Sequence, residues 1–143
     1  MRGLSCFILT FISYASLASP SRSDEMIPLL ELIGKGADNT YPIVRCAALF
    51  YSVLLYAGET QMGPENTKKI NDEVAAWVNL ATEIRAPAMK ENARPSVIKD
   101  ISLLSDQYLS RYQSNYTSFG QAFGTDALWQ SDTDVCVKLF GKK

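Results

Sequence analysis

The residues best suited to acid–base chemistry in this sequence are two close pairs of carboxylates. Asp72 lies beside Glu73, and Asp132 lies two positions before Asp134. Two carboxylates catalyse hydrolysis as general acid and base only when both face one substrate. Neighbouring residues on a helix point apart, which disfavours the first pair. The second pair stands at an expected helix start, where capping and the helix dipole account for both side chains, so we predict no catalytic residue.

Histidine is absent from these 143 residues. Its absence excludes a histidine general base, a Ser-His-Asp triad and a histidine-ligated haem or zinc site within them. The segment 38–40 holds only part of the oxygen ligand set of a calcium loop, and the Gly-Lys-Gly at 34–36 is too short for a phosphate loop. We therefore expect no metal site and no cofactor, and we favour a binding protein over an enzyme.

Residues 1–18 have the three parts of a secretory signal peptide. Arg2 supplies a positive charge, a short apolar run follows at 4–12, and small residues stand at Ser16 and Ala18. The apolar run is too short to span ~30 Å of hydrocarbon comfortably. We predict cleavage after Ala18, which leaves residues 19–143 as one domain in the periplasm or outside the cell, without a membrane attachment.

Three cysteines are present, and cleavage removes Cys6. Cys46 and Cys136 remain as an even pair in a compartment where disulfides persist. We predict a disulfide between them; the alternative is two unpaired buried thiols. A cation such as Arg45 beside Cys46 favours a reactive thiolate, but a thiol oxidoreductase normally carries its second cysteine in the same motif.

Apolar residues recur at helical spacing along the whole exported part of the chain. They predict helices over 27–33, 43–57, 68–84 and 97–119, and a last helix that starts at a cap of Ser131 or Asp132. Arg45 is the only charge in 43–57, and the uncharged remainder is too short to span a membrane, so we interpret this segment as a central core helix. No segment alternates with the period of a strand. The predicted fold is an all-α antiparallel bundle of four to five helices, with the disulfide joining the central and carboxy-terminal helices.

A stripe of aromatic residues is the most distinctive feature of the helix at 97–119. Three tyrosines four residues apart share one helix face, and two phenylalanines extend it: Tyr108, Tyr112, Tyr116, Phe119 and Phe123. Such a stripe supplies a groove for a peptide, an apolar ligand or a partner protein. It is equally typical of the edge of a core, with hydroxyl groups reaching water. Both interpretations stay open from the sequence.

The net charge of −1, without any basic stripe, gives no electrostatic support for nucleic-acid binding. Our hypothesis is an exported, non-enzymatic binding or accessory module with a protein partner in its own compartment. The alternatives are a carrier of a small apolar ligand held between helices and a carboxylate-dependent hydrolase. Asn115-Tyr116-Thr117 matches the glycosylation acceptor pattern but falls inside a predicted helix. These patterns predict no oligomeric state.

Overall fold

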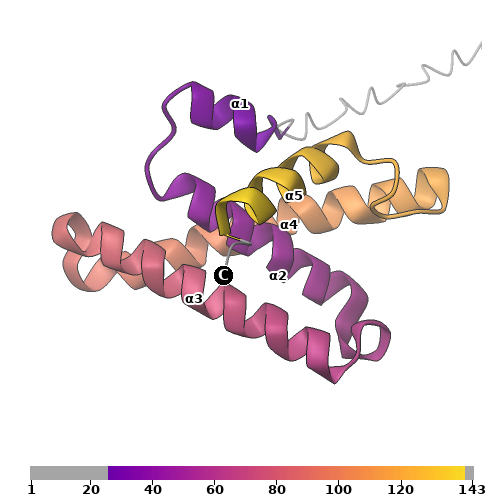
Figure 1. Cartoon of the computed structure of the whole chain (residues 1–143), viewed down its shortest axis with the longest axis horizontal. Helices are drawn as coiled ribbons and strands as arrows, with labels where there is room; N and C mark the ends of the chain where they lie inside the picture. Colours follow the sequence, from indigo (N-terminus) through magenta and orange to yellow (C-terminus); the bar gives the residue numbers. More distant parts are fainter. Residues whose placement is uncertain (1–25, 141–143) are drawn as a thin grey trace, which may run out of the picture.

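The computed structural model describes residues 26–140, which form a bundle of α-helices (Figure 1). The helices are α1 (Leu29–Gly34), α2 (Tyr41–Met62), α3 (Pro64–Met89), α4 (Ala93–Phe119) and α5 (Ala127–Phe140), and the 3-10 turn η1 (Lys90–Asn92) joins α3 to α4. Within this part of the chain there is no strand, so the predicted all-α bundle of four to five helices is confirmed. The predicted signal peptide and its cleavage site lie outside the described residues.

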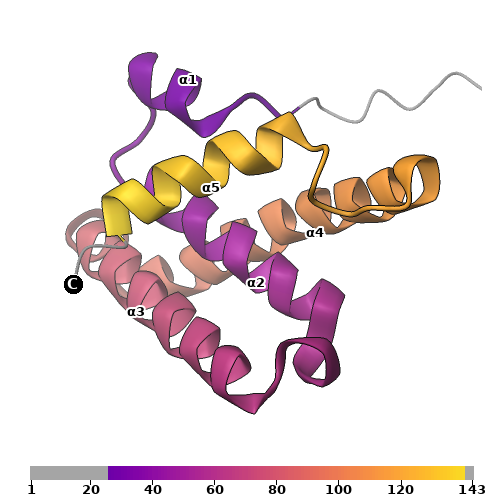
Figure 2. The same ribbon diagram turned by 45° about the vertical axis from the view of Figure 1, so that its right-hand side comes forward.

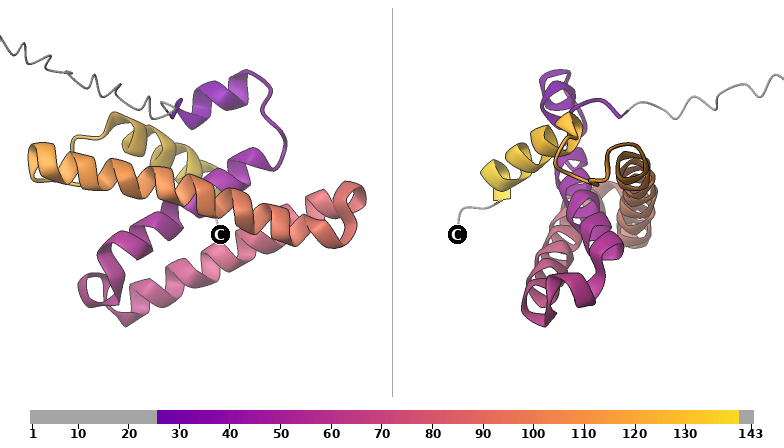
Figure 3. Two further views of the ribbon diagram at one scale, coloured as in Figure 1. Left: turned by 180° about the vertical axis from the view of Figure 1, so that it is seen from behind. Right: turned by 90° about the vertical axis from the view of Figure 1, so that its right-hand side faces the viewer.

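The helix α2 is the central helix, as its apolar sequence predicts. α3 and α4 pack along it, and α5 crosses it on the side away from α4 (Figure 3). α1 packs against α5 and α2. A helix with neighbours on several sides needs apolar residues all round, and an unbroken run of α2 is accordingly buried: Ile43, Val44, Arg45, Cys46, Ala47, Ala48 and Leu49.

Within residues 26–140, α2 is also the one helix long and apolar enough to cross a membrane by length and composition. The core helix of a soluble protein meets the same criterion. Here its most apolar stretch forms the centre of the bundle, with the charged Arg45 buried among the other helices.

Two helices extend beyond their predicted ends. Gly58 was expected to end α2, but the helix resumes and runs to Met62, with Gly58 as a break at φ 66° and ψ 173°. Glycine adopts this positive φ without a steric cost. α3 starts at Pro64 rather than 68, because proline suits the first turn of a helix, and it continues past Pro87 to Met89.

The helix α5 starts earlier than predicted, and the expected cap at Ser131 or Asp132 is wrong. The cap is Asp126, whose Oδ1 accepts hydrogen bonds from the backbone N–H groups of Leu128 at 3.0 Å and Trp129 at 3.1 Å. This is the usual geometry of an amino-terminal cap. Asp132 therefore falls in the middle of the helix and not at its start.

Candidate functional site

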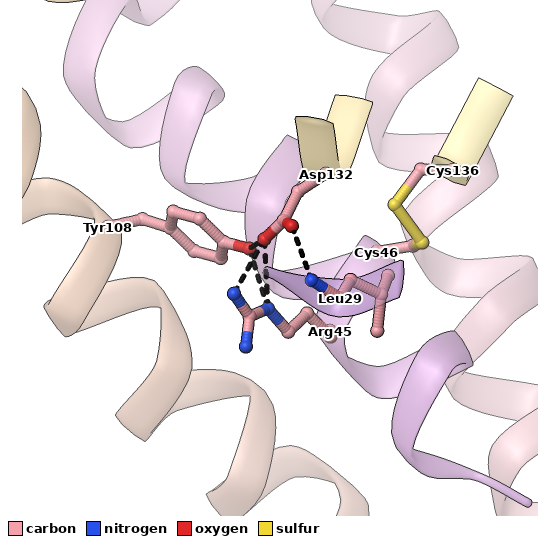
Figure 4. Close-up of a disulfide and its surroundings, with 6 residues drawn as sticks. All are labelled: Leu29, Arg45, Cys46, Tyr108, Asp132 and Cys136. Atoms are coloured by element: carbon pink, nitrogen blue, oxygen red, sulfur yellow. Dashed lines mark hydrogen bonds and ion pairs between the residues drawn. A yellow bond between two sulfur atoms is a disulfide. The ribbon is translucent and has the colours of Figure 1, made fainter. Parts of the chain in front are cut away.

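The predicted disulfide between Cys46 and Cys136 is present and joins α2 to α5 (Figure 4). The Cα atoms lie 5.5 Å apart, and both residues are buried. A buried disulfide is compatible with an oxidising, exported compartment.

One helical turn before Cys136, the carboxylate of Asp132 is fully buried and joins four helices (Figure 4). Its Oδ2 accepts hydrogen bonds from Arg45 Nη2 of α2 at 2.6 Å and from the Tyr108 hydroxyl of α4. Its Oδ1 accepts a hydrogen bond from the backbone N–H of Leu29, the first residue of α1, at 2.7 Å. Asp132 therefore holds α1, α2 and α4 against α5 through a single side chain.

The guanidinium of Arg45 is equally enclosed and well paired. Its Nε donates to the Tyr108 hydroxyl at 2.9 Å, and its Nη1 donates to the Tyr41 hydroxyl at 3.2 Å. Burial opposes the charged form, but interactions with Tyr108 and Asp132 outweigh this, so the pKa of Arg45 is raised. Burial raises the pKa of Tyr108 and keeps it a neutral hydroxyl. The network is thus a saturated internal ion pair whose role is structural.

The structure separates the members of both carboxylate pairs. Asp132 is enclosed, whereas Asp134 is exposed two positions later on α5. On α3, Asp72 forms a surface ion pair with Lys68 at 2.5 Å, and Glu73 is half-buried beside a groove. Side chains one or two positions apart on a helix point in different directions. Neither pair therefore presents two carboxylates to one substrate.

The aromatic stripe divides into a buried and an exposed part. Tyr108 and Tyr112 are fully buried, and the half-buried Phe123 packs edge-on against Tyr112 with ring centroids 4.7 Å apart. Tyr116 and Phe119, near the end of α4, are 59% and 66% exposed. Tyr116 and Phe119 of the predicted surface are therefore accessible to a partner, Phe123 is partly accessible, and Tyr108 and Tyr112 belong to the core.

A second buried carboxylate, Asp126, anchors the loop between α4 and α5. Its Oδ2 accepts hydrogen bonds from Arg111 Nε at 2.5 Å and Asn115 Nδ2 at 2.6 Å. Burial acts to raise its pKa, but the hydrogen bonds from Arg111, the Trp129 backbone and Asn115 outweigh this and lower it. Asn115 Nδ2 also donates to the Ala122 carbonyl, so the amide of the predicted glycosylation acceptor is engaged inside the protein.

We expect Asp126→Asn to lower the free energy of unfolding by at least about 1 kcal/mol at pH 7, because Oδ1 can keep the cap but the amide Nδ2 that replaces Oδ2 cannot accept from Arg111 Nε or Asn115 Nδ2. The folded-state pKa lies below the usual 3.8, so this contribution is present above that value and is lost as the pH falls through the folded-state pKa. Urea unfolding over a pH series should show the two proteins converging in acid. Asp106→Asn, at an exposed position of α4, is the control. A gap that stays constant with pH would contradict the assignment.

A groove of about 550 Å³ opens between α2, α3 and α5. Figure 2 shows α5 crossing α2. Apolar residues from all three helices line the groove and are called its apolar wall: Phe50, Met62, Ile70, Trp77, Cys136 and Val137. Polar residues complete the lining: Gln61, Asn66, Lys69 and Glu73. The Phe50 and Trp77 rings pack with centroids 5.4 Å apart, which gives the apolar wall a rigid aromatic part.

Of these groove residues only Cys136 was singled out from the sequence, as a partner in the disulfide and not as part of a binding site. The sequence signal that could have found the groove is the set of polar residues at positions 66, 69 and 73, which lie close to the apolar Ile70 and Trp77. Val137 is 53% exposed on the last turns of α5. The groove combines residues of three separate helices, an arrangement that no local pattern indicates.

No group of three or more cysteines and carboxylates within residues 26–140 is arranged to hold a metal ion. A second hollow, of about 470 Å³, contains Arg85. That guanidinium already donates to Thr40, Ser96 and Asp100. Its hydrogen bonds hold the start of α2 to α3 and α4, so it serves the fold.

No protein family matches the chain, and comparison with curated proteins and with solved structures found no match. The groove is therefore assigned as the candidate functional site on its geometry and chemistry.

Proposed function

We propose that the protein is an exported, non-enzymatic binding module and that the groove between α2, α3 and α5 is its binding site. Two observations support export. The segment 1–18 has the pattern of a signal peptide, and a buried disulfide is stable in an oxidising compartment.

The observation that carries the proposal is the mixed apolar and polar lining of the groove. Ligand sites commonly have volumes of about 300–1,000 Å³, with apolar walls and a few polar groups that orient the ligand. This groove has a volume of about 550 Å³, and its lining combines aromatic and aliphatic side chains with four polar ones. It suits an amphipathic ligand better than a wholly apolar one.

The alternative of a hydrolase has less support from the carboxylates. Asp132 is enclosed and its oxygens accept from Arg45, Tyr108 and the Leu29 backbone, so no lone pair is directed at a substrate. Glu73 reaches the groove, but its neighbour Asp72 is paired with Lys68 on the surface. A binding role uses the groove without a second carboxylate.

Val137→Arg tests the proposal by filling the groove. The immobilised protein is incubated with the exported fraction of its source cells, and retained molecules are identified by mass spectrometry. We expect Val137→Arg to retain a specific molecule at least about tenfold less than the wild type, a loss of about 1.4 kcal/mol in binding.

Leu103→Arg is the matched control, because Leu103 is 54% exposed, close to the 53% of Val137, and lies outside the groove. It should retain as much as the wild type. A molecule retained equally by all three proteins, or no specific molecule at all, would rule out the groove as the binding site.

A further inference from the structure

Two lysine–carboxylate pairs with the same spacing occur at successive positions of α3. Only one of them forms an ion pair within residues 26–140. Lys68 Nζ pairs with Asp72 Oδ2 at 2.5 Å on the outer surface. Lys69 and Glu73 both line the groove, and within residues 26–140 neither forms an ion pair. The groove therefore presents one cation and one anion beside its apolar wall, both available to a ligand.

The distance between these charges sets the size of a complementary ligand. Side chains four residues apart on a helix have Cβ atoms about 5–6 Å apart. An extended peptide spans about 3.3–3.6 Å per residue, so the free termini of a two- or three-residue peptide lie about 7–10 Å apart. The long side chains of Lys69 and Glu73 cover this range. A free amino acid carries both charges on one carbon and is too short to meet the two side chains in this way.

The remaining groove residues suit the middle of such a peptide. Gln61 and Asn66 are exposed carboxamides at the junction of α2 and α3, and each offers a donor and an acceptor, as a peptide group requires. Asn66 Nδ2 donates to the Met62 carbonyl at 2.9 Å, which leaves Oδ1 to accept from a peptide N–H. The apolar wall with Phe50 and Trp77 receives an apolar side chain.

We propose that the groove binds short peptides of two or three residues with free termini and an apolar side chain. Lys69 pairs with the terminal carboxylate, Glu73 pairs with the terminal ammonium, and the aromatic wall holds the side chain. This inference rests on the proposed binding role and names the chemical class of the ligand.

Trp77 supplies a direct readout, because the chain has two tryptophans and only Trp77 lines the groove. In a Trp129→Phe variant, Trp77 fluorescence reports occupancy. Leucyl-leucine should give a saturable change, with an affinity at least about tenfold above those of N-acetyl-leucyl-leucine amide, which lacks both charges, and glycyl-glycine, which lacks apolar side chains. In Trp77→Phe, where Trp129 is the only tryptophan, the same titration should leave the fluorescence unchanged.

The two charge pairs of α3 provide matched variants. Lys69→Met and Glu73→Gln should each weaken leucyl-leucine binding by about fivefold or more, because each removes a charged partner of the peptide. Lys68→Met and Asp72→Asn, one position away on the same helix, should change it by less than about twofold. Equal binding of the free and blocked dipeptides, equal effects of the two pairs, or no binding up to about 10 mM would each overturn the inference.

The two proposals fail separately. If leucyl-leucine does not bind but a retained molecule still depends on Val137, the groove is a binding site for another chemical class. If neither leucyl-leucine nor any retained molecule depends on the groove, both proposals are wrong.

Discussion

Replacing Arg45 with methionine is expected to lower the free energy of unfolding by about 3–5 kcal/mol. Asp132 would then be a fully buried carboxylate without a cation, although it would still accept hydrogen bonds from Tyr108 and the Leu29 backbone. Removing one partner of a buried ion pair costs far more than the pair itself contributes, because the remaining charge has lost its contact with water. Urea unfolding followed by circular dichroism measures the change.

The double variant Arg45→Met/Asp132→Leu separates the cost of an unpaired charge from the loss of packing. It should be more stable than Arg45→Met alone, since no buried charge remains. The double variant should regain only part of the lost free energy of unfolding, because the Leu29 N–H loses its acceptor. Arg94→Met is the control for removing a surface arginine that bonds only Asn79, and it should stay within about 0.5 kcal/mol of the wild type. An Arg45→Met protein as stable as the wild type would contradict the structural role of the network.

Replacing Cys46 and Cys136 with alanine is expected to lower the free energy of unfolding by up to about 4.6 kcal/mol. The disulfide closes a loop of 90 residues, and opening it gives the unfolded chain much more conformational freedom. The backbone of α5 lies close to α1 and α2 but not to α3 or α4, so the covalent bond holds a helix with few other neighbours. Urea unfolding with and without dithiothreitol measures the effect.

The double alanine variant is its own control, because dithiothreitol should leave its unfolding unchanged. The wild type in dithiothreitol should approach the stability of that variant. The exported protein, measured by mass under non-reducing conditions, should contain no free thiol. Free Cys46 and Cys136 thiols in correctly exported protein, or a loss below about 1 kcal/mol on reduction, would contradict the prediction.

The disulfide and the ion pair act at one junction. Arg45 and Cys46 are adjacent on α2, and Asp132 and Cys136 are one turn apart on α5. Residues in such close contact change stability non-additively, so the two sets of variants should be coupled. Reduction should therefore destabilise Arg45→Met by a different amount than it destabilises the wild type.

The sequence by itself determined the class of fold, because the relevant signals are local. Apolar residues at helical spacing predicted the segments that became α1 to α4, and the continuously apolar run around Ala47 identified α2 as the central helix. The disulfide could also be predicted from the sequence, because an exported chain with two remaining cysteines has a single possible pairing. Export itself stays a prediction from residues 1–18.

Only the tertiary structure decided which side chains are buried and what they contact. Arg45 looked like an interruption of an apolar helix, and its partner Asp132 lies 87 positions away. Tyr108 and Tyr116 occupy the same helix face, yet one is fully buried and the other is 59% exposed. The spacing of residues within a helix sets which face they share, but burial along that face depends on where the neighbouring helices end.

The groove, too, could not be predicted from the sequence alone. Its lining comes from α2, α3 and α5, and α5 takes part because the disulfide and Asp132 hold it to α2. Helical periodicity reports contacts within a few residues along the chain. The packing of distant helices against one another, driven by burial of their apolar faces, is what brings Val137 and Ile70 into the lining of one groove and creates the candidate site.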